Sequence, residues 1–317
     1  MSSLIDNVSN RNLQGELAMM SIHRPIAVVL ALLFVSTATV ASAEDAVTLR
    51  YKYGENDKLI YRTTTKLTQK QVVGERTVKT DMVSEDVSIR TLEAVDKKGG
   101  FAIRTENKLL KTTLDIGPLG KYVFDSRSEE RDKGSVIAAA VTPVYDRLNG
   151  AILTIKHTPR GKVTAVDGYK ELMQGVLKNN PLGAQFTGGE NGALMKFADA
   201  FPVMSAKPVQ PGDTWVDEYE LEMPKFGKAK GKKTYTYVGK DKLAERDTVK
   251  LTVTNELSFD LDLALMGTKT TGNLSISKST GTIHFDAAKG QLVSMKAEHT
   301  LGGNINVTAG GQTFAIQ

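Results

Sequence analysis

The chain has 317 residues, no cysteine and a formal net charge of +5. The absence of cysteine excludes disulfides, a cysteine nucleophile, a thiolate metal site and a lipid-modified N-terminal cysteine. The small positive charge, with both signs interspersed, gives no reason to expect nucleic acid as a partner.

The first 43 residues have the pattern of a secretory signal peptide with an extended n-region. A basic Arg24 precedes an apolar run over 26–35, about half the roughly 20 residues that span a bilayer. Ala41 and Ala43 match the A-x-A rule for recognition by signal peptidase. We therefore expect cleavage after Ala43 and a protein exported to the periplasm or the cell exterior, with no transmembrane segment in the mature chain.

From residue 44 onward, apolar and polar residues alternate with a period of two. The pattern is clearest at 249–261 and recurs at 47–53, 59–67 and 101–109. Such alternation predicts antiparallel strands with one buried face and one wet face. Further strands are expected near 82–95, 121–127, 151–157, 162–166, 215–223, 233–238, 269–277, 281–286, 291–301, 304–308 and 312–316.

Helical patterns are confined to the middle of the chain. Small apolar residues predict a helix at 134–148, and an i, i+3, i+4 stripe predicts one after Asp167 that ends at Pro181. A third candidate covers 191–201. We expect these helices to cover an open face of the sheet.

Two parts of the chain resemble each other on either side of a proline-rich stretch at 202–213. Asp57 aligns with Asp213, and Gly161 aligns with Gly290 in a turn near the end of each half. Both glycines are expected to be left-handed residues that close a hairpin. The alignment predicts an internal duplication.

These patterns divide the chain into a signal peptide (1–43), a first β half with helical insertions (44–205) and a second β half (206–317). The predicted fold class is mainly β, with long antiparallel strands in a strongly curved sheet, or an open or half barrel, built from two related halves. Whether the halves share one sheet stays open. The true start also stays open, because Met19 or Met20 would give a more ordinary n-region than Met1.

No motif in the sequence indicates catalysis or metal binding. The three histidines after the predicted cleavage site, His157, His284 and His299, lack the spacing of a metal site. Ser275 and Lys278 form an S-x-x-K match, but on a strand they point to opposite faces. We expect no enzyme, no cofactor and no metal.

The densest charge cluster is KFGKAKGKK, whose lysines are Lys225, Lys228, Lys230, Lys232 and Lys233. One interpretation is a basic hairpin tip that contacts anionic lipid or acidic envelope polymer. The other is a solvated loop that discourages edge pairing. Trp215, the single tryptophan, shares a strand face with Tyr219 and is expected in the core.

The segments YGENDKLIY and PGDTW, and the G-K-V that follows a turn, resemble a family of uncharacterised exported β-rich bacterial proteins, over most of 47–301. The resemblance implies a β-rich fold and transfers no catalytic residue. More loosely, a curved sheet with a few covering helices is similar to half-barrel carriers of the lipoprotein-localisation type. Those carriers hold acyl chains between a concave sheet and helices.

We therefore expect an exported, non-enzymatic protein that binds a hydrophobic or amphipathic ligand, such as a lipid, on a concave β surface. The first alternative is a structural or adhesive envelope module that binds envelope polymer and no small ligand. The second is a hydrolase with paired carboxylates in the sheet concavity. The ligand and the oligomeric state are not determined by the sequence.

Overall fold

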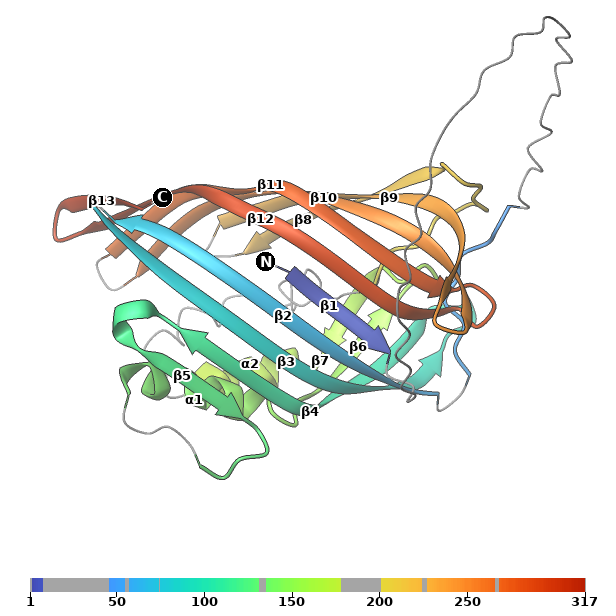
Figure 1. Ribbon diagram of the computed structural model, residues 1–317, viewed down its shortest axis with the longest axis horizontal. Helices are drawn as coiled ribbons and strands as arrows, with labels where there is room; N and C mark the ends of the chain where they lie inside the picture. The colour runs from blue at the N-terminus through green and yellow to red at the C-terminus, as the bar shows by residue number, and fades with distance from the viewer. Residues whose placement is uncertain are drawn as a thin grey trace, which may run out of the picture.

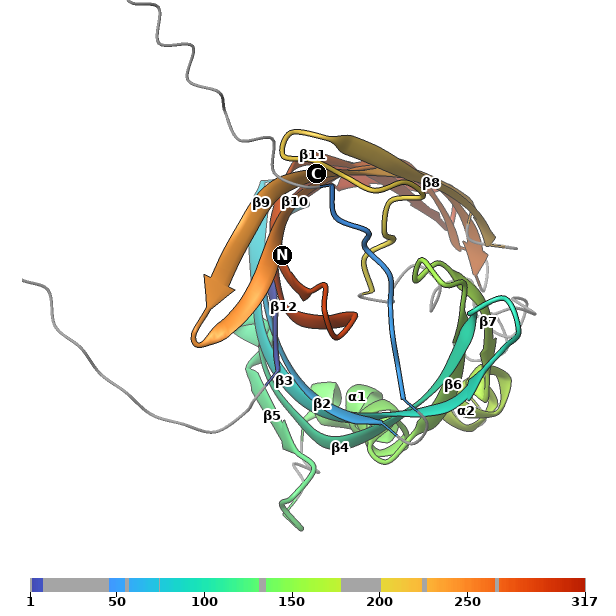
Figure 2. The same ribbon diagram turned by 90° about the vertical axis from the view of Figure 1, so that its right-hand side faces the viewer.

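The computed structural model describes residues 2–7, 46–54, 57–73, 75–130, 135–177, 201–223, 227–265 and 268–316. These residues form one antiparallel sheet of 13 strands and a few helices (Figure 1). The sheet curls into an open barrel when it is viewed along its axis (Figure 2). The predicted fold class is confirmed, and the two halves share a single sheet.

The bounds of the elements follow in chain order. They are β1 (Ser2–Asn7), β2 (Lys58–Val73), β3 (Arg76–Val95), β4 (Phe101–Asp115), η1 (Gly117–Leu119), β5 (Lys121–Asp125), α1 (Val136–Leu148), β6 (Ile152–His157), β7 (Val163–Asp167), α2 (Tyr169–Leu177), β8 (Thr214–Met223), β9 (Gly227–Leu243), β10 (Arg246–Leu265), β11 (Thr268–Asp286), β12 (Gln291–Ala309) and β13 (Gln312–Ile316). Across the sheet the order is β7-β6-β4-β3-β2-β1-β12-β11-β10-β9-β8. In addition, β5 pairs with β4, and β13 pairs with β12 and β2.

Several strands are longer than their alternation suggests. β11 and β12 each run through a stretch that the sequence predicts as a break between two strands. A register shift between Ile276 and Lys278 lets the pairing of β11 with β12 continue past the polar residues between the two predicted strands. A bulge inserts a residue without ending the pairing, so an interrupted pattern does not end the strand.

The predicted strand at 47–53 is wrong, because the segment 46–54 crosses the inside of the barrel instead of joining the sheet (Figure 2). We call this segment strap A. Its pairing is an isolated bridge between Val47 and Val209. Leu49 and Tyr51 are nevertheless buried as their alternation implies. Any extended chain alternates its side chains, so the pattern predicted the buried face but not the partner.

A second strap, residues 201–209 (strap B), enters the same end of the barrel. The hydroxyl of Tyr51 donates a hydrogen bond to the carbonyl of Pro202 at 2.9 Å, which joins the two straps. Met204 of strap B is fully buried. Side chains of the two straps therefore fill the interior at this end of the barrel, which the strands alone would leave empty.

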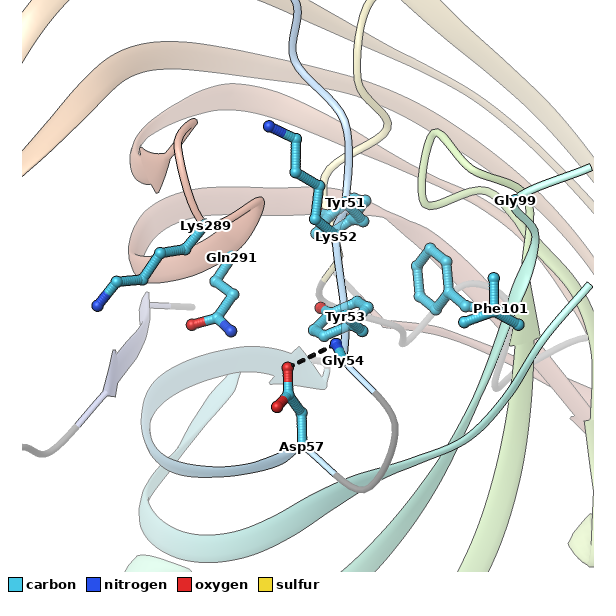
Figure 3. A pocket seen from close by; sticks show the side chains of 10 residues that line it. Tyr51, Lys52, Tyr53, Gly54, Asp57, Gly99, Phe101, Lys289 and Gln291 are labelled. Carbon is cyan, nitrogen blue, oxygen red and sulfur yellow. Dashed lines mark hydrogen bonds between the residues drawn. The ribbon is translucent and has the colours of Figure 1, made fainter.

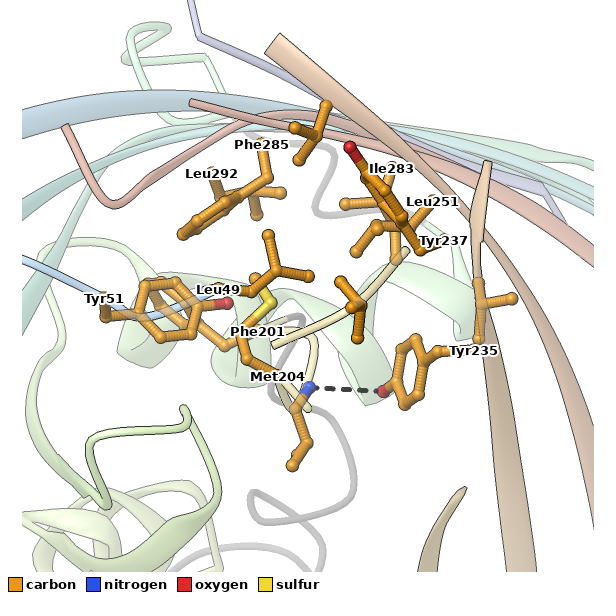
Figure 4. Close-up of a cluster of buried hydrophobic side chains, with 14 of the residues drawn as sticks. Leu49, Tyr51, Phe201, Met204, Tyr235, Tyr237, Leu251, Ile283, Phe285 and Leu292 are labelled. Carbon is orange, nitrogen blue, oxygen red and sulfur yellow. Dashed lines mark hydrogen bonds between the residues drawn. The ribbon is translucent and has the colours of Figure 1, made fainter. Parts of the chain in front are cut away.

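The main hydrophobic core lies where the straps meet the sheet (Figure 4). Its largest fully buried side chains include Tyr61, Tyr235, Tyr237 and Phe285, which come from both halves of the chain. The hydroxyl of Tyr61 donates to the carbonyl of Leu292 at 3.0 Å, so its polar end is satisfied inside the core. Burying each such side chain contributes about 1.5–3 kcal/mol. This shared core explains why the halves are not separate domains.

The straps dock on the two glycine turns. The backbone N–H of Lys52 in strap A donates to the carbonyl of Gly290 in the second half at 3.1 Å, and that of Met204 in strap B donates to the carbonyl of Arg160 in the first half at 2.8 Å. Strap A therefore ties the first half to the second, and strap B ties the start of the second half to the first.

Two glycines permit this close docking. Gly161 has φ 90° and Gly290 has φ 65°, as expected for left-handed turn residues. A Cβ at position 161 would overlap the ring of Tyr51, and one at position 290 would overlap the backbone nitrogen of Lys52. Close approach of a strap adds a second reason for glycine in each turn.

The start of each half has the same local geometry. The Asp57 carboxylate accepts a hydrogen bond from the N–H of Gly54 at 2.8 Å, and the Asp213 carboxylate accepts one from the N–H of Gln210 at 2.8 Å. Both contacts span three residues and lead from a strap into a strand. These positions match the predicted alignment of the halves, while the duplication itself stays a prediction.

The helices lie where the pattern places them. Ser135 caps α1 by accepting a hydrogen bond from the N–H of Ala138, and Pro143 lies within the helix. α1 packs on Leu110, Tyr122 and Phe124 of β4 and β5 in a second, smaller core. No helix among the described residues is long and apolar enough to cross a bilayer.

The expected N-cap of α2 is wrong. Asp167 ends β7 and its carboxylate lies 2.8 Å from the ammonium of Lys156. The predicted helix at 191–201 falls almost wholly outside the described residues. The cleavage site at Ala41 and Ala43 also lies outside them, so signal cleavage stays a prediction.

Candidate functional site

The concave face of β10 changes character along the strand. Near its start, Val249, Leu251 and Val253 are buried in the main core with 4%, 0% and 6% exposure. Pairing with β9 continues in register, so later alternate residues face the same way. These are Leu257, Phe259, Leu261 and Leu263, and all four are half-exposed. The inward-facing side chains of β10 are therefore buried at one end of the strand and only partly buried at the other.

We call this uncovered surface the open wall, and it includes neighbouring residues of β11. Leu274 lies opposite Phe259, and Ile276 follows on the same face; both are half-exposed. Polar residues alternate on the convex side, where Ser258 and Asp260 are exposed. The open wall is therefore a continuous apolar stretch rather than scattered exposed residues.

Glycines opposite the open wall leave it without cross-strand cover. Leu257 lies opposite Gly231, while Leu261 lies opposite Gly227 on β9 and Gly272 on β11. A glycine supplies no side chain to pack against its cross-strand partner. The ring of Tyr219 takes the space above Gly231, whereas Leu261 has no cross-strand side chain on either neighbouring strand.

A hollow of about 730 Å³ adjoins the open wall at Gly231. Its lining includes the apolar Leu257 and Ile276 together with Tyr219, whose hydroxyl donates to the amide oxygen of Asn255 at 3.0 Å. The Tyr219 ring lies so close to Gly231 that a Cβ there would overlap it. Burial raises the pKa of Tyr219 above its usual value.

Charged pairs line the convex side of the same hollow. Lys230 lies 3.4 Å from Glu220, and Lys232 lies 3.1 Å from Glu256. Lys230 lies opposite Ser258, and Lys232 lies opposite Glu256, so these charged side chains share the convex face and Leu257 faces inward. The sheet therefore separates these charges from the open wall.

The predicted lysine cluster does not form a free basic tip in the part that the structure describes. Lys228, Lys230, Lys232 and Lys233 lie within β9, opposite Glu222, Glu220, Glu218 and Asp217 of β8. Lys233 is directed at the Tyr219 ring, with its ammonium 5.7 Å from the ring centroid. Lys225 lies outside the described residues. The acidic strand alongside therefore balances the positive charge that the sequence shows.

A second concavity of about 480 Å³ lies beside strap A (Figure 3). Tyr51, Tyr53 and Phe101 line it, together with Lys52 and Asp57. The Lys52 ammonium donates to two backbone carbonyls of the turn after β11, each at 3.3 Å. The Asp57 carboxylate holds the backbone of strap A. Because these polar groups anchor the strap, we assign this concavity a structural role.

The partly buried carboxyl of Asp86 and the guanidinium of Arg90 lie between the two ends. Arg90 lies 4.9 Å from the ring centroid of Tyr61 and 4.7 Å from that of Phe201. Burial raises the pKa of Asp86, while a hydrogen bond from Thr63 and the charge of Arg90 oppose that rise. Burial also raises the pKa of Tyr61 to about 12.

The three histidines lie apart in different surroundings. His157 is 4% exposed and stacks on Phe101 with ring centroids 4.8 Å apart. His284 contacts the Asp241 carboxylate at 3.2 Å, and His299 contacts the Ser279 hydroxyl at 2.9 Å. Within the described ranges, no group of three or more His, Asp or Glu side chains could hold a metal ion.

The fold defines an open antiparallel β barrel with two internal straps and an uncovered apolar stretch of inner wall. A family model described as a family of unknown function (DUF6263) matches residues 99–292. This match covers more than half of the chain, so the protein belongs to that family. No curated protein and no solved structure matches the chain.

Sequence reasoning identified the residues of the open wall but assigned them to the core. Leu257 and Leu261 continue the alternation of Leu251 and Val253, with Asn255 as the one polar residue on that face. The available signal for their exposure was the glycines at 227, 231 and 272, which lie on the neighbouring strands β9 and β11. Their effect depends on strand register, which periodicity does not specify. Trp215, by contrast, is partly buried against the core as predicted, and its indole N–H donates to the carbonyl of Val203 at 2.7 Å.

Proposed function

We propose that this protein is exported and non-enzymatic, and that it holds a hydrophobic or amphipathic ligand against the open wall. The observation that carries the proposal is the change along one face of β10. Leu251 is 0% exposed, whereas Leu257 and Phe259 on the same face are half-exposed. Large apolar patches on a soluble protein mark interaction sites.

The hollow at Gly231 supports a ligand with a polar end as well as an apolar one. The apolar groups of the ligand would lie on Leu257, Phe259 and Leu261. Its polar end would reach the hydroxyl of Tyr219 and the amide of Asn255, which lie on the same face of the sheet as Leu257. A lipid or fatty acid has this chemistry.

The export part of the proposal rests on the leader sequence. The apolar run over 26–35 and the A-x-A site at Ala41 and Ala43 are followed by a chain without cysteine. The periplasm or the cell exterior is the corresponding location. The open barrel neither requires nor opposes export.

The alternative of an adhesive module that binds envelope polymer through lysines receives less support. Its main feature was the cluster at 225–233, and the described lysines there lie opposite carboxylates of β8. The hydrolase alternative requires two carboxyl groups facing each other across a cleft. Asp86 contacts Thr63 and Arg90, which does not favour that arrangement.

Residues of β10 on opposite faces provide the test. Phe259 lies on the open wall, and Ala264 is exposed on the convex face, away from the hollow at Gly231. Phe259→Asp places a charge on the wall, and we expect it to weaken binding of the fluorescent fatty acid cis-parinaric acid at least about tenfold, or about 1.4 kcal/mol. Ala264→Asp adds the same charge outside and is expected to leave the affinity unchanged. Equal affinity of both variants, or no saturable binding by the wild-type chain, would contradict the proposal.

A further inference from the structure

The long strands β2 and β12 do not pair with each other directly. β1 lies between β2 and β12 and pairs antiparallel with both (Figure 1). Ser2 lies opposite Lys66 on one side and Glu298 on the other, and Leu4 lies opposite Thr64 and Lys296. A single extended segment therefore completes two hydrogen-bond ladders at once.

β13 fills the same position further along. Ile316 lies opposite Ile305 of β12 and Val73 of β2. Val73 lies seven positions after Lys66 on β2, and Ile305 lies seven positions after Glu298 on β12. Because the spacing is equal on both edges, β2 and β12 lie one strand apart along this stretch. We call the space between them the slot; β1 occupies one end of it and β13 the other.

The direction of the bounding strands explains why the slot needs a strand. Because β1 is antiparallel to both β2 and β12, these two strands run parallel to each other. Direct closure would create a parallel pair in an otherwise antiparallel sheet, and parallel pairing is slightly less stable per residue. An inserted strand that is antiparallel to both edges keeps the sheet uniform.

β1 belongs to the segment that we propose is removed on export. Cleavage after Ala43 would leave two facing edges, at 61–66 of β2 and 294–298 of β12, with unpaired backbone groups. Such edges are templates for an added strand. Arg62, Lys66 and Lys296 belong to the convex side of these edges. Arg62 pairs with Glu85 at 3.3 Å and Lys296 pairs with Glu298 at 3.2 Å, so Lys66 gives this side one positive charge in excess.

We propose that in the exported protein this slot binds an extended segment of a partner polypeptide, inserted antiparallel to β2 and β12 as β1 is. The inferred partner segment alternates apolar with polar residues and carries an acidic residue at the outward position opposite Lys66. The inference rests on the export part of the proposed function and is independent of ligand binding at the open wall.

The absence of native cysteine makes disulfide trapping specific to introduced sites. The chain is expressed in full, exported from its own host and purified, and its N-terminus is determined by intact mass. The probe is a peptide of residues 2–7 with Leu4→Cys. It is expected to form a disulfide with a Thr64→Cys chain, because paired strands lie about 4.8 Å apart. Thr68→Cys, four residues along β2, is the control and is expected to trap at least about tenfold less peptide.

Two further variants complete the test. A probe that also carries Ile5→Pro lacks a ladder N–H and is expected to lose the trapping. In a chain with Thr64→Cys and Lys296→Cys, the two sites lie two strand spacings apart, roughly 9.6 Å, which is too far for a disulfide. A disulfide in that chain would show that the slot closes on itself and would overturn the inference.

The remaining outcomes separate the two proposals. An intact mass that retains residues 2–7 contradicts export, and the inference of a vacated slot falls with it. A mass that starts at residue 44 while the peptide is not trapped, or is trapped equally at positions 64 and 68, leaves export standing and overturns the slot.

Discussion

The two ends of the barrel use the same strands for different purposes. At the strapped end, the inner faces of β9, β10 and β11 are covered by segments 46–54 and 201–209, and their side chains form the main core. At the opposite end, the same face of β10 continues with leucine and phenylalanine but remains half-exposed. Apolar alternation therefore predicts the inward face of a strand and leaves its packing partner undetermined. That partner decides whether the face stabilises the fold or is available to a ligand.

The largest difference in the free energy of unfolding is expected between substitutions of two leucines of β10. Leu251→Ala removes a fully buried side chain and should lower the free energy of unfolding by about 2–5 kcal/mol. Leu261→Ala removes a half-exposed one and should cost about 1 kcal/mol, while weakening binding of cis-parinaric acid. Urea unfolding followed by tryptophan fluorescence measures both changes. Equal losses of stability would contradict the distinction between the two ends.

The next largest effect concerns strap docking. Gly290→Ala introduces a Cβ that overlaps the backbone of strap A, in addition to the left-handed φ of 65°. We expect a loss of about 2–4 kcal/mol, combining overpacking with backbone strain. Gly310→Ala is the matched control, because its φ is 58° and a Cβ there meets no atom within 4 Å. Its expected cost is about 1 kcal/mol, and thermal unfolding of both variants tests the difference.

A second pair of glycine variants tests strap docking at the turn that contains Gly161. Gly161 and Gly212 have φ of 90° and 94°, but a Cβ meets neighbouring atoms only at Gly161. Gly161→Ala should therefore destabilise the chain more than Gly212→Ala. If the two substitutions are equivalent, strap docking contributes little to the strapped end.

The smallest effect is expected from Asp86, between the two ends. Burial raises the pKa of its carboxyl, so the folded state holds this proton more tightly than the unfolded state. Its contribution to stability therefore falls as pH rises through the unfolded pKa of about 3.9 towards the folded value, and stays lower above that. Asp86→Asn should raise the melting temperature at neutral pH and leave it unchanged near pH 3. Glu85→Gln on the adjacent position is the control, and a similar pH-dependent gain there would contradict burial as the cause.

The sequence predicted the parts of the fold that depend on local pattern. β10, β13 and α1 follow from periodicity, and Gly161 and Gly290 follow from turn chemistry. The straps did not follow, because Leu49 and Tyr51 alternate like strand residues although they lie inside the barrel. The open wall also did not follow, because its exposure depends on glycines of other strands brought opposite Leu257 and Leu261 by register. Long-range pairing decided both cases.

The central claim is that the open wall holds a hydrophobic or amphipathic ligand. Native mass spectrometry of the protein purified from its own host in a volatile buffer tests it most directly. We predict a bound species of lipid mass at about one per chain, which is lost in Phe259→Asp and kept in Ala264→Asp. Wild-type protein that carries no bound species, and takes up none when mixed with cis-parinaric acid, would contradict the claim.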